Sequence, residues 1–458
     1  MLPLLDNLAP SGDLFLHADG VVGVEEFLGA AQSLADRLGD ERHVMNLCDD
    51  RYQFAVGFAA ALLNGQTTLM PPNRAPELIS SLLADYPDTR IVWDRGLPGL
   101  PPPPVPVTET TAIPPAHDTP AARQPAVIPA IPLVPADLEA VVAFTSGSTG
   151  KPKPNIKTWA ALHIGTGMAA TRFFANRGGH QIVATVPPQH MYGLETSVLY
   201  AMLAGCPTSS GRPFFPADVA TALASLSAPR VLVTTPAHLR ALVKAGVTLP
   251  NLEFMISATA PLPLSLAQQA ESMFHTEVRE IYGCTEAGSL ASRRQTASGN
   301  WQLYDGMTLT PANGSLLLAG PQLSQAVPLQ DQIDLLEDGC FALRGRNEDM
   351  LNIAGKRASL ADLTNTLLEI DGVEDAVMIA PDDSDDARVG RVAGLVVAPG
   401  LSAEEVLAAL RPKIDPAFLP RPLLNVAALP RNAASKLPRS AVLELLQREL
   451  QAHKAEQA

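Results

Sequence analysis

The chain has 458 residues, 47% of them hydrophobic, and its 33 basic and 47 acidic residues give a net charge of −14. This length exceeds one typical domain, so two or more domains with sizeable cores are expected. The acidic balance and the lack of any run of five or six basic residues argue against nucleic acid or an anionic membrane as the main partner.

The four cysteines lie far apart and form no C-x-x-C pair, which argues against a zinc site and against a disulfide framework. The start of the chain lacks a basic region followed by a long apolar core. Its longest apolar stretch, residues 55–63, is about half as long as a membrane span. We therefore expect a cytoplasmic protein with no membrane insertion.

Residues 21–93 alternate two kinds of hydrophobic pattern. Val24–Leu38 and Tyr52–Asn64 have helical periodicity, whereas Thr67–Met70 and Ile91–Trp93 are short apolar strands. Such alternation predicts an α/β fold. Residues 98–135 then hold 13 of the 42 prolines, so this segment is expected to cross the surface in an extended form.

A dense run of hydroxyls and glycines follows the apolar segment Ala140–Phe144, which predicts a buried strand. The glycines let backbone N–H groups approach an anion, and two lysines beyond them add positive charge. The run therefore predicts a loop that binds a polyphosphate. Its members are Thr145, Ser146, Gly147, Ser148, Thr149, Gly150, Lys151 and Lys153. A Walker A loop is excluded, because only two residues separate the glycines and a proline follows Lys151.

From residue 136 to 346 strands and helices alternate again, with strands expected at Ile182–Val186, Val231–Thr234, Phe254–Ser257 and Val278–Tyr282. Polar motifs follow several of them, as expected where an α/β sheet binds ligands beyond the carboxyl ends of its strands. After Glu348 the pattern is a small α+β unit. Helices are expected at Leu360–Ile370, Ala403–Leu410 and Ser440–Gln451, and strands at Val373–Ile379 and Val392–Val397.

Five segments resemble, in order, the signatures of the adenylate-forming superfamily, which includes acyl-CoA synthetases, aryl-acid ligases, peptide-synthetase adenylation domains and luciferases. The first is the phosphate loop. The others are Tyr282–Glu286 (Y-G-x-T-E), Leu343–Met350 (G-R-x-D-D-x-I), Ile353–Leu363, and Leu429–Arg439 (P-x-x-x-x-G-K). The resemblance implies a large multi-layer α/β domain, residues 1–346, and a small mobile α+β domain, residues 347–458.

By this resemblance the 145–150 loop and Lys153 hold the β- and γ-phosphates of ATP. Tyr282 would stack on adenine, Thr285 would contact the α-phosphate and Glu286 would bind Mg²⁺. These roles also suit the residues themselves, because an aromatic face fits a base and a carboxylate oxygen fits Mg²⁺.

The resemblance assigns the ribose to Asp331 and Arg346, although Leu329-Gln330 replaces the Thr-Gly that usually precedes the aspartate. The segment Ser257–Leu262, which includes Ala260, resembles S-G-G-A-P-L and would run under the adenine and along the substrate. Alanine and threonine replace its two glycines, so we expect less close backbone contact there.

Lys436 would bridge the acid and the α-phosphate, with Ser435 in place of the usual glycine. His190 would border the acyl pocket, and as a lone histidine it fits a packed, hydrogen-bonded role equally well. Glu348 would be the hinge, and Gly355 would line the tunnel for the thiol acceptor.

The implied reaction is ATP-dependent activation of a carboxylic acid to acyl-AMP, followed by thioester formation with the pantetheine thiol of CoA or of an acyl carrier protein. An aryl or short acid is expected. Two alternatives are a non-catalytic member that binds nucleotide or acyl-AMP, and a peptide-synthetase-type enzyme that activates amino acids. The latter usually places an aspartate where residues 231–235 have none. Only 44 residues separate Glu286 from Asp331, which predicts a compact member.

Overall fold

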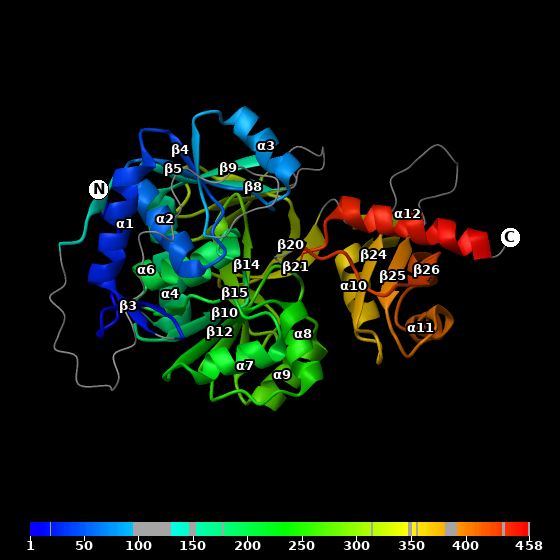
Figure 1. The fold of residues 1–458 in the computed structure, drawn as a ribbon. Helices are drawn as coiled ribbons and strands as arrows, with labels where there is room; N and C mark the ends of the chain where they lie inside the picture. Colours follow the sequence, from blue (N-terminus) through cyan, green and yellow to red (C-terminus); the bar gives the residue numbers. More distant parts are fainter. Residues whose placement is uncertain are drawn as a thin grey trace.

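The computed structural model describes residues 1–18, 20–94, 130–145, 153–175, 178–312, 315–346, 350–353, 356–380, 392–432 and 436–456. Stacked sheets and helices make up a large N-terminal part, and the last hundred residues form a smaller part beside strands β20 and β21 (Figure 1). Within the described part of the chain, no helix is both long enough and apolar enough to cross a membrane.

The largest sheet has eleven strands, in the order β20-β21-β16-β15-β14-β13-β12-β10-β11-β2-β3. Its centre, from β2 to β14, is parallel, and both ends are antiparallel. The strands are β2 Asp13–Leu16, β3 Val21–Gly23, β10 Gln181–Ala184, β11 Thr208–Ser209, β12 Arg230–Thr234, β13 Phe254–Ser257, β14 Glu277–Cys284, β15 Gly288–Arg293, β16 Trp301–Leu303, β20 Asp331–Leu335 and β21 Cys340–Arg346.

Alternate residues of the parallel strands serve two different cores, as the period of two in a strand requires. One face packs under α7 Pro216–Ala224, α8 Pro236–Ala245 and α9 Leu264–Phe274, and the other packs against α4 Trp159–Phe174. Leu232 and Met255 belong to the first core, whereas the adjacent Val233 and Ile256 belong to the second. Both faces of these strands are buried, which explains their nearly continuous apolar sequence.

A second sheet has five strands in the order β6-β4-β5-β8-β9, parallel except for the β8–β9 pair. Helix α2 is buried all round and contacts this sheet, α1 and the helical segment after His190, so it fills the space between layers. These elements are β4 His43–Asn46, β5 Thr67–Met70, β6 Thr89–Val92, β8 Glu139–Thr145, β9 Lys153–Thr158, α1 Val24–Leu38, α2 Arg51–Leu63, α3 Pro76–Asp85, α5 Met191–Gly193, the π-helix Leu194–Leu199 and α6 Tyr200–Leu203.

The shortened region before Asp331 forms a three-stranded antiparallel sheet of β17 Thr308–Ala312, β18 Ser315–Ala319 and β19 Val327–Leu329. The proline-rich segment lies mostly outside the described residues. Its end forms β7 Leu133–Val134, which pairs with β1 Leu2–Pro3.

The C-terminal elements have hydrophobic clusters of their own, built from residues between Leu351 and Leu450. A β-hairpin precedes a three-stranded sheet, β24-β25-β26, that three helices accompany. They are β22 Met350–Ile353, β23 Lys356–Ser359, α10 Leu360–Leu368, β24 Asp375–Ile379, β25 Ala393–Val397, α11 Ala403–Leu410, the 3₁₀ turn Pro416–Phe418, β26 Leu423–Asn425 and α12 Arg439–Glu456.

The predicted α/β class is confirmed, and most predicted elements lie where expected. The bounds of Val24–Leu38, Thr67–Met70, Phe254–Ser257 and Ala403–Leu410 agree fully. The strand expected at Ile91–Trp93 instead runs from Thr89 to Val92, because its pairing with β4 begins at the polar Thr89 and Arg90.

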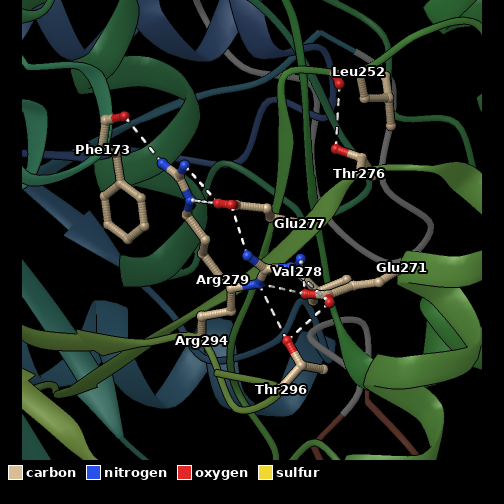
Figure 2. A network of polar contacts seen from close by, with 9 residues as sticks. All are labelled: Phe173, Leu252, Glu271, Thr276, Glu277, Val278, Arg279, Arg294 and Thr296. Atoms are coloured by element: carbon tan, nitrogen blue, oxygen red, sulfur yellow. Dashed lines mark hydrogen bonds and ion pairs between the residues drawn. The ribbon is translucent and has the colours of Figure 1, made fainter. Parts of the chain in front are cut away.

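A network of ion pairs fixes the start of β14, at the end opposite to Tyr282 (Figure 2). Arg294 binds Glu271 of α9 at 3.0 Å and Glu277 at 2.7 Å, and Arg279 binds Glu277 at 2.7 Å. Thr296 also donates a hydrogen bond of 2.8 Å to Glu271. The network ties α9 to the β14–β15 hairpin far along the strand from the residues predicted to bind nucleotide.

Candidate active site

The predicted phosphate loop joins two antiparallel strands. Thr145 ends β8 and is paired with Lys153, which begins β9 and is exposed. The residues from Ser146 to Gly150 lie outside the described part, as do Lys151 and Pro152. The strand that precedes the loop, β8, is buried in the second sheet, as the sequence predicted.

Thr285 and Glu286 lie at the tip of the β14–β15 hairpin. The strands pair from Glu280–Arg293 up to Cys284–Gly288, which leaves three residues in the loop, and Ala287 N–H donates to Cys284 O. Gly288 follows with φ +78°, the left-handed residue that typically closes such a loop. Glu286 is exposed and Thr285 half-buried, so both are available to a ligand.

Cys284, also in this motif, is not a reactive thiol. Burial, together with the charge of Glu286, raises its pKa to about 11. The thiolate is therefore scarce at neutral pH.

The structure brings together three residues that the sequence assigned to the nucleoside. The hydroxyl of Tyr282 lies 2.6 Å from Oδ2 of Asp331. Asp331 is in turn the register partner of Arg346 across the β20–β21 pair. The Tyr282 ring packs against Trp301 and Phe341, with centroids 5.5 and 5.7 Å away, which fixes its position.

The segment after β13 has alanine and threonine where the related motif has glycine, and its backbone is strained as a result. Thr259 has φ +79°, a value that glycine adopts readily and a β-branched residue rarely does. Among the described residues, the hydroxyls of Ser257 and Thr259 are buried without a hydrogen-bond partner. Ala260 is half-buried beside them. The glycine-like turn thus persists although the glycines are absent.

His190 is neutral at physiological pH. Burial and, to a smaller extent, the charge of Lys436 lower its pKa to about 3. Its Nδ1 accepts a hydrogen bond from Tyr192 N–H, 3.4 Å away, which places the ring proton on Nε2. Lys436 therefore contributes to the electrostatic environment of His190, although the two residues are 246 positions apart in the chain.

The segment that carries Lys436 is anchored on the C-terminal sheet. Arg431 makes a bidentate ion pair with Asp375 of β24, with distances of 2.7 and 2.8 Å. The main chains of Asn432 and Lys436 are also hydrogen-bonded, at 2.9 Å. On the other side Glu374 forms an ion pair with Lys244 of α8, so this part of the C-terminal sheet touches the large N-terminal part.

Sequence reasoning missed Arg51, which is fully buried. Its guanidinium donates five hydrogen bonds of 2.7–3.0 Å, one to the hydroxyl of Ser197 and four to the carbonyls of Ala184, Val186, Ser209 and Gly211. Burial lowers its pKa to about 10 against the opposing charge of Asp50. Arg51 thus fixes the end of β10 and the approach to His190. It stood one residue before the predicted helix, and a cation beside a largely apolar helix was the available signal.

Two further charged residues near the hairpin tip, Lys157 and Glu195, were also missed.

The remaining predicted positions, Glu348 and Gly355, lie outside the described residues. Within the described part no three His, Cys, Asp or Glu side chains gather into a metal site. One exposed carboxylate at a hairpin tip does fit a Mg²⁺ held mainly by phosphate oxygens and water.

Comparisons with known proteins agree with this geometry. Residues 26–314 match the model of the family described as AMP-binding enzyme, and the chain belongs to that family. A 4-coumarate–CoA ligase from Rhodobacter capsulatus is 29% identical over 50% of this chain, which covers 58% of that ligase. An indoleacetate–CoA ligase from Aromatoleum aromaticum is 25% identical, over 71% of this chain and 69% of that ligase.

The fold extends over nearly the whole chain in a solved structure. O-succinylbenzoate coenzyme A synthetase from Bacillus subtilis, in complex with ATP and magnesium ion, aligns with a TM-score of 0.77. The alignment covers 95% of this chain and 97% of that one, at 17% identity. The family match and these relatives together confirm the resemblance to the adenylate-forming superfamily.

Proposed function

We propose that the protein is an AMP-forming carboxylic-acid ligase that works in two steps. In the first, a carboxylate oxygen attacks the α-phosphorus of ATP, and the bond to the bridging oxygen breaks to release pyrophosphate. In the second, a pantetheine thiol loses its proton, its sulfur attacks the acyl carbon, and AMP leaves as the thioester forms. The CoA ligases among the relatives support this reaction.

The observation that carries the proposal is geometric: the Tyr282 hydroxyl lies 2.6 Å from Asp331, and Asp331 pairs in register with Arg346. Residues of three separate motifs thus meet where the nucleoside of ATP would bind. An anionic acid must come close to a polyphosphate, and this repulsion needs fixed positive charge and hydrogen-bond donors. Lys436 supplies the charge, and the neutral His190 has an Nε2 proton to donate. Bound Mg²⁺, held by Glu286, would neutralise further phosphate charge.

The remaining residues orient the reactants. Thr285 would contact the α-phosphate from the hairpin tip, and the loop from Thr145 to Lys153 would hold the β- and γ-phosphates. Asp331 and Arg346 would bind the ribose, and Tyr282, whose hydroxyl bonds Asp331, would border the adenine. A turn of residues 347–458 relative to residues 1–346 would then present Gly355 to the thiol.

For the acid we propose an aryl or short carboxylic acid. The segments beside His190 and after β13 present Met191, Tyr192 and Ala258, which are apolar or aromatic and buried. CoA is the first candidate for the acceptor, since the relatives are CoA ligases. A carrier protein bears the same pantetheine thiol and is the second.

A panel of acids tests the proposal. Pyrophosphate release is measured with benzoates, short aliphatic acids, amino acids and palmitate at saturating MgATP. The best acid is then incubated with CoA or a phosphopantetheinylated carrier protein, and the products are identified by mass spectrometry. Benzoates or short acids should give the fastest release. Folded protein that releases no pyrophosphate with any acid would show that the proposed activity is wrong.

A further inference from the structure

We infer that Lys157 and Glu195 are positioning residues that clamp the β14–β15 hairpin, so that its tip holds Thr285 and Glu286 in place for MgATP. The inference rests on the proposed function and assigns roles to two residues that lie outside the recognised motifs.

Lys157 is an inward-facing cation on the strand that leaves the phosphate loop. Its side chain is 7% exposed, whereas the neighbouring Ile156 is 53% exposed. This reverses the usual pattern, in which the strand would bury the isoleucine and expose the lysine. The ammonium group donates a hydrogen bond to the main-chain oxygen of Glu286. Lys157 thus joins β9 of the five-stranded sheet to the tip of a hairpin in the eleven-stranded sheet.

Glu195 lies in the π-helix and contacts β15, the second strand of the hairpin. Its carboxylate accepts hydrogen bonds from the hydroxyl and the main-chain N–H of Ser289. It also packs on Gly288, where an added Cβ would lie 2.8 Å from Oε1. π-helical turns inside α-helices are often found at functional sites, because the extra residue redirects one side chain.

The charges of Lys157 and Glu195 stabilise each other electrostatically, while their hydrogen bonds go to the hairpin. Burial lowers the pKa of Lys157, and the carboxylate of Glu195 is the largest influence that opposes this. Burial likewise raises the pKa of Glu195, against the Ser289 hydrogen bonds and the charge of Lys157. Each residue is therefore free to bond the hairpin, Lys157 at the tip and Glu195 on the strand that follows it.

The clamp has a chemical purpose, because a short hairpin tip is otherwise free to move. Thr285 and Glu286 must meet the phosphates presented by the loop between β8 and β9, and a displacement of about 1 Å lowers rates severely. Lys157 connects the strand that follows this loop directly to the main chain of Glu286. One side chain thereby sets the distance between β9 and the main chain of the proposed metal ligand.

The test uses Lys157→Met, which keeps the length and apolar stem of the side chain but removes the donor. We expect the KM for MgATP to rise about tenfold, while the KM for the acid changes less than twofold. MgATP should raise the midpoint of thermal unfolding less in the variant than in the wild type. This measurement reports MgATP binding and does not depend on turnover. The exposed neighbour provides the control, and Ile156→Thr should leave all three quantities unchanged.

A double variant separates positioning from mere stability. Lys157→Met leaves Glu195 as an uncompensated buried charge, which destabilises the fold. Lys157→Met combined with Glu195→Gln removes that charge, so the thermal midpoint without ligand should recover. MgATP binding should stay weak, because the donor to Glu286 is still missing. Recovery of both quantities would overturn the inference, as would an unchanged KM for MgATP in the single variant.

Failure of the clamp and failure of the proposed reaction give different results. If the wild-type protein turns over an acid and Lys157→Met has the same constants, only the clamp is wrong. If the wild-type protein turns over no acid, the MgATP-induced shift of the thermal midpoint still compares the variants. An equal shift in wild type and Lys157→Met then rejects the clamp.

Discussion

Thr259 shows that a backbone conformation typical of the family can persist when the residue that favours it has been replaced. It occupies a left-handed conformation in the turn after β13 where the related motif has glycine. Such a conformation costs about 1–3 kcal/mol for a non-glycine residue. Its buried hydroxyl finds no partner among the described residues, which adds to the cost.

Thr259→Gly should therefore stabilise the protein. We expect the free energy of unfolding to rise by about 1 kcal/mol, after subtraction of the extra chain entropy of glycine. Chemical denaturation measures the change. The same substitution at Thr310, exposed in β17, provides the control, because there threonine suits the strand and glycine should lower stability. A loss of stability in Thr259→Gly would show that the turn is not strained.

His190 offers a test of the approach of Lys436 that does not depend on activity. Since burial and Lys436 both lower the pKa of His190, Lys436→Ala should raise it, although burial keeps it below the ordinary 6.5. Titration of the imidazole signals by NMR measures the shift. Lys413→Ala, at an exposed lysine of the same C-terminal part, should leave the pKa unchanged. An unaltered pKa in Lys436→Ala would place the lysine away from the histidine in solution.

At the scale of elements, β14 is held at one end by ion pairs and carries the proposed chemistry at the other. Burial alone would raise the pKa of Glu271, but hydrogen bonds from Arg294, Val278 N–H and Thr296 outweigh it, so the pKa is lowered from 4.5. A carboxyl group whose pKa is lower in the folded state stabilises the fold at any pH above its pKa in the unfolded chain. This stabilisation is lost as the pH falls through the pKa of the folded state.

Glu271→Gln should consequently destabilise the protein at pH 7, by about 1 kcal/mol, and much less in acid. The difference in unfolding free energy between wild type and variant should shrink as the pH falls below about 4.5. Urea denaturation between pH 3.5 and 7 measures it. Glu253→Gln, an exposed acid just before β13, is a suitable control. A pH-independent difference would mean that the charge of Glu271 is unimportant.

The elements that the sequence predicted correctly are those with a strong local pattern. The buried parallel strands were apparent as short apolar runs, and the motifs at their ends predicted the candidate site. The hairpin tip was not foreseen, although Gly288, four positions beyond Cys284, fits a three-residue loop. Lys157 was missed because strand alternation alone would place Ile156 inside. Only the contact with a distant hairpin explains the reversed order.

At the scale of the whole molecule, the two half-reactions should separate by variant. Lys436 serves acyl-AMP formation alone in the proposed reaction, so its removal takes away an interaction of one transition state. Lys436→Ala should make almost no acyl-AMP from acid and ATP, yet convert supplied acyl-AMP to thioester. Gly355→Trp should do the reverse, because a bulky side chain would fill the proposed thiol tunnel.

Both half-reactions are measured for both variants, by pyrophosphate release and by thioester yield from synthetic acyl-AMP. Equal losses in the two steps for Lys436→Ala would mean that the lysine acts in both or supports the fold. A rotation between residues 1–346 and 347–458 would then lose its main support.

Arg51 also bears on how the chain is made. All five of its hydrogen-bond acceptors belong to residues 133–160 positions further along the sequence. At the usual speed of translation, about 5–20 residues per second, these acceptors leave the ribosome roughly 7–30 s after Arg51 does. During that interval the guanidinium must stay hydrated, and helix α2 cannot take its final buried place. Until Gly211 has emerged from the ribosome, the nascent chain therefore exposes apolar surface and should depend on chaperones.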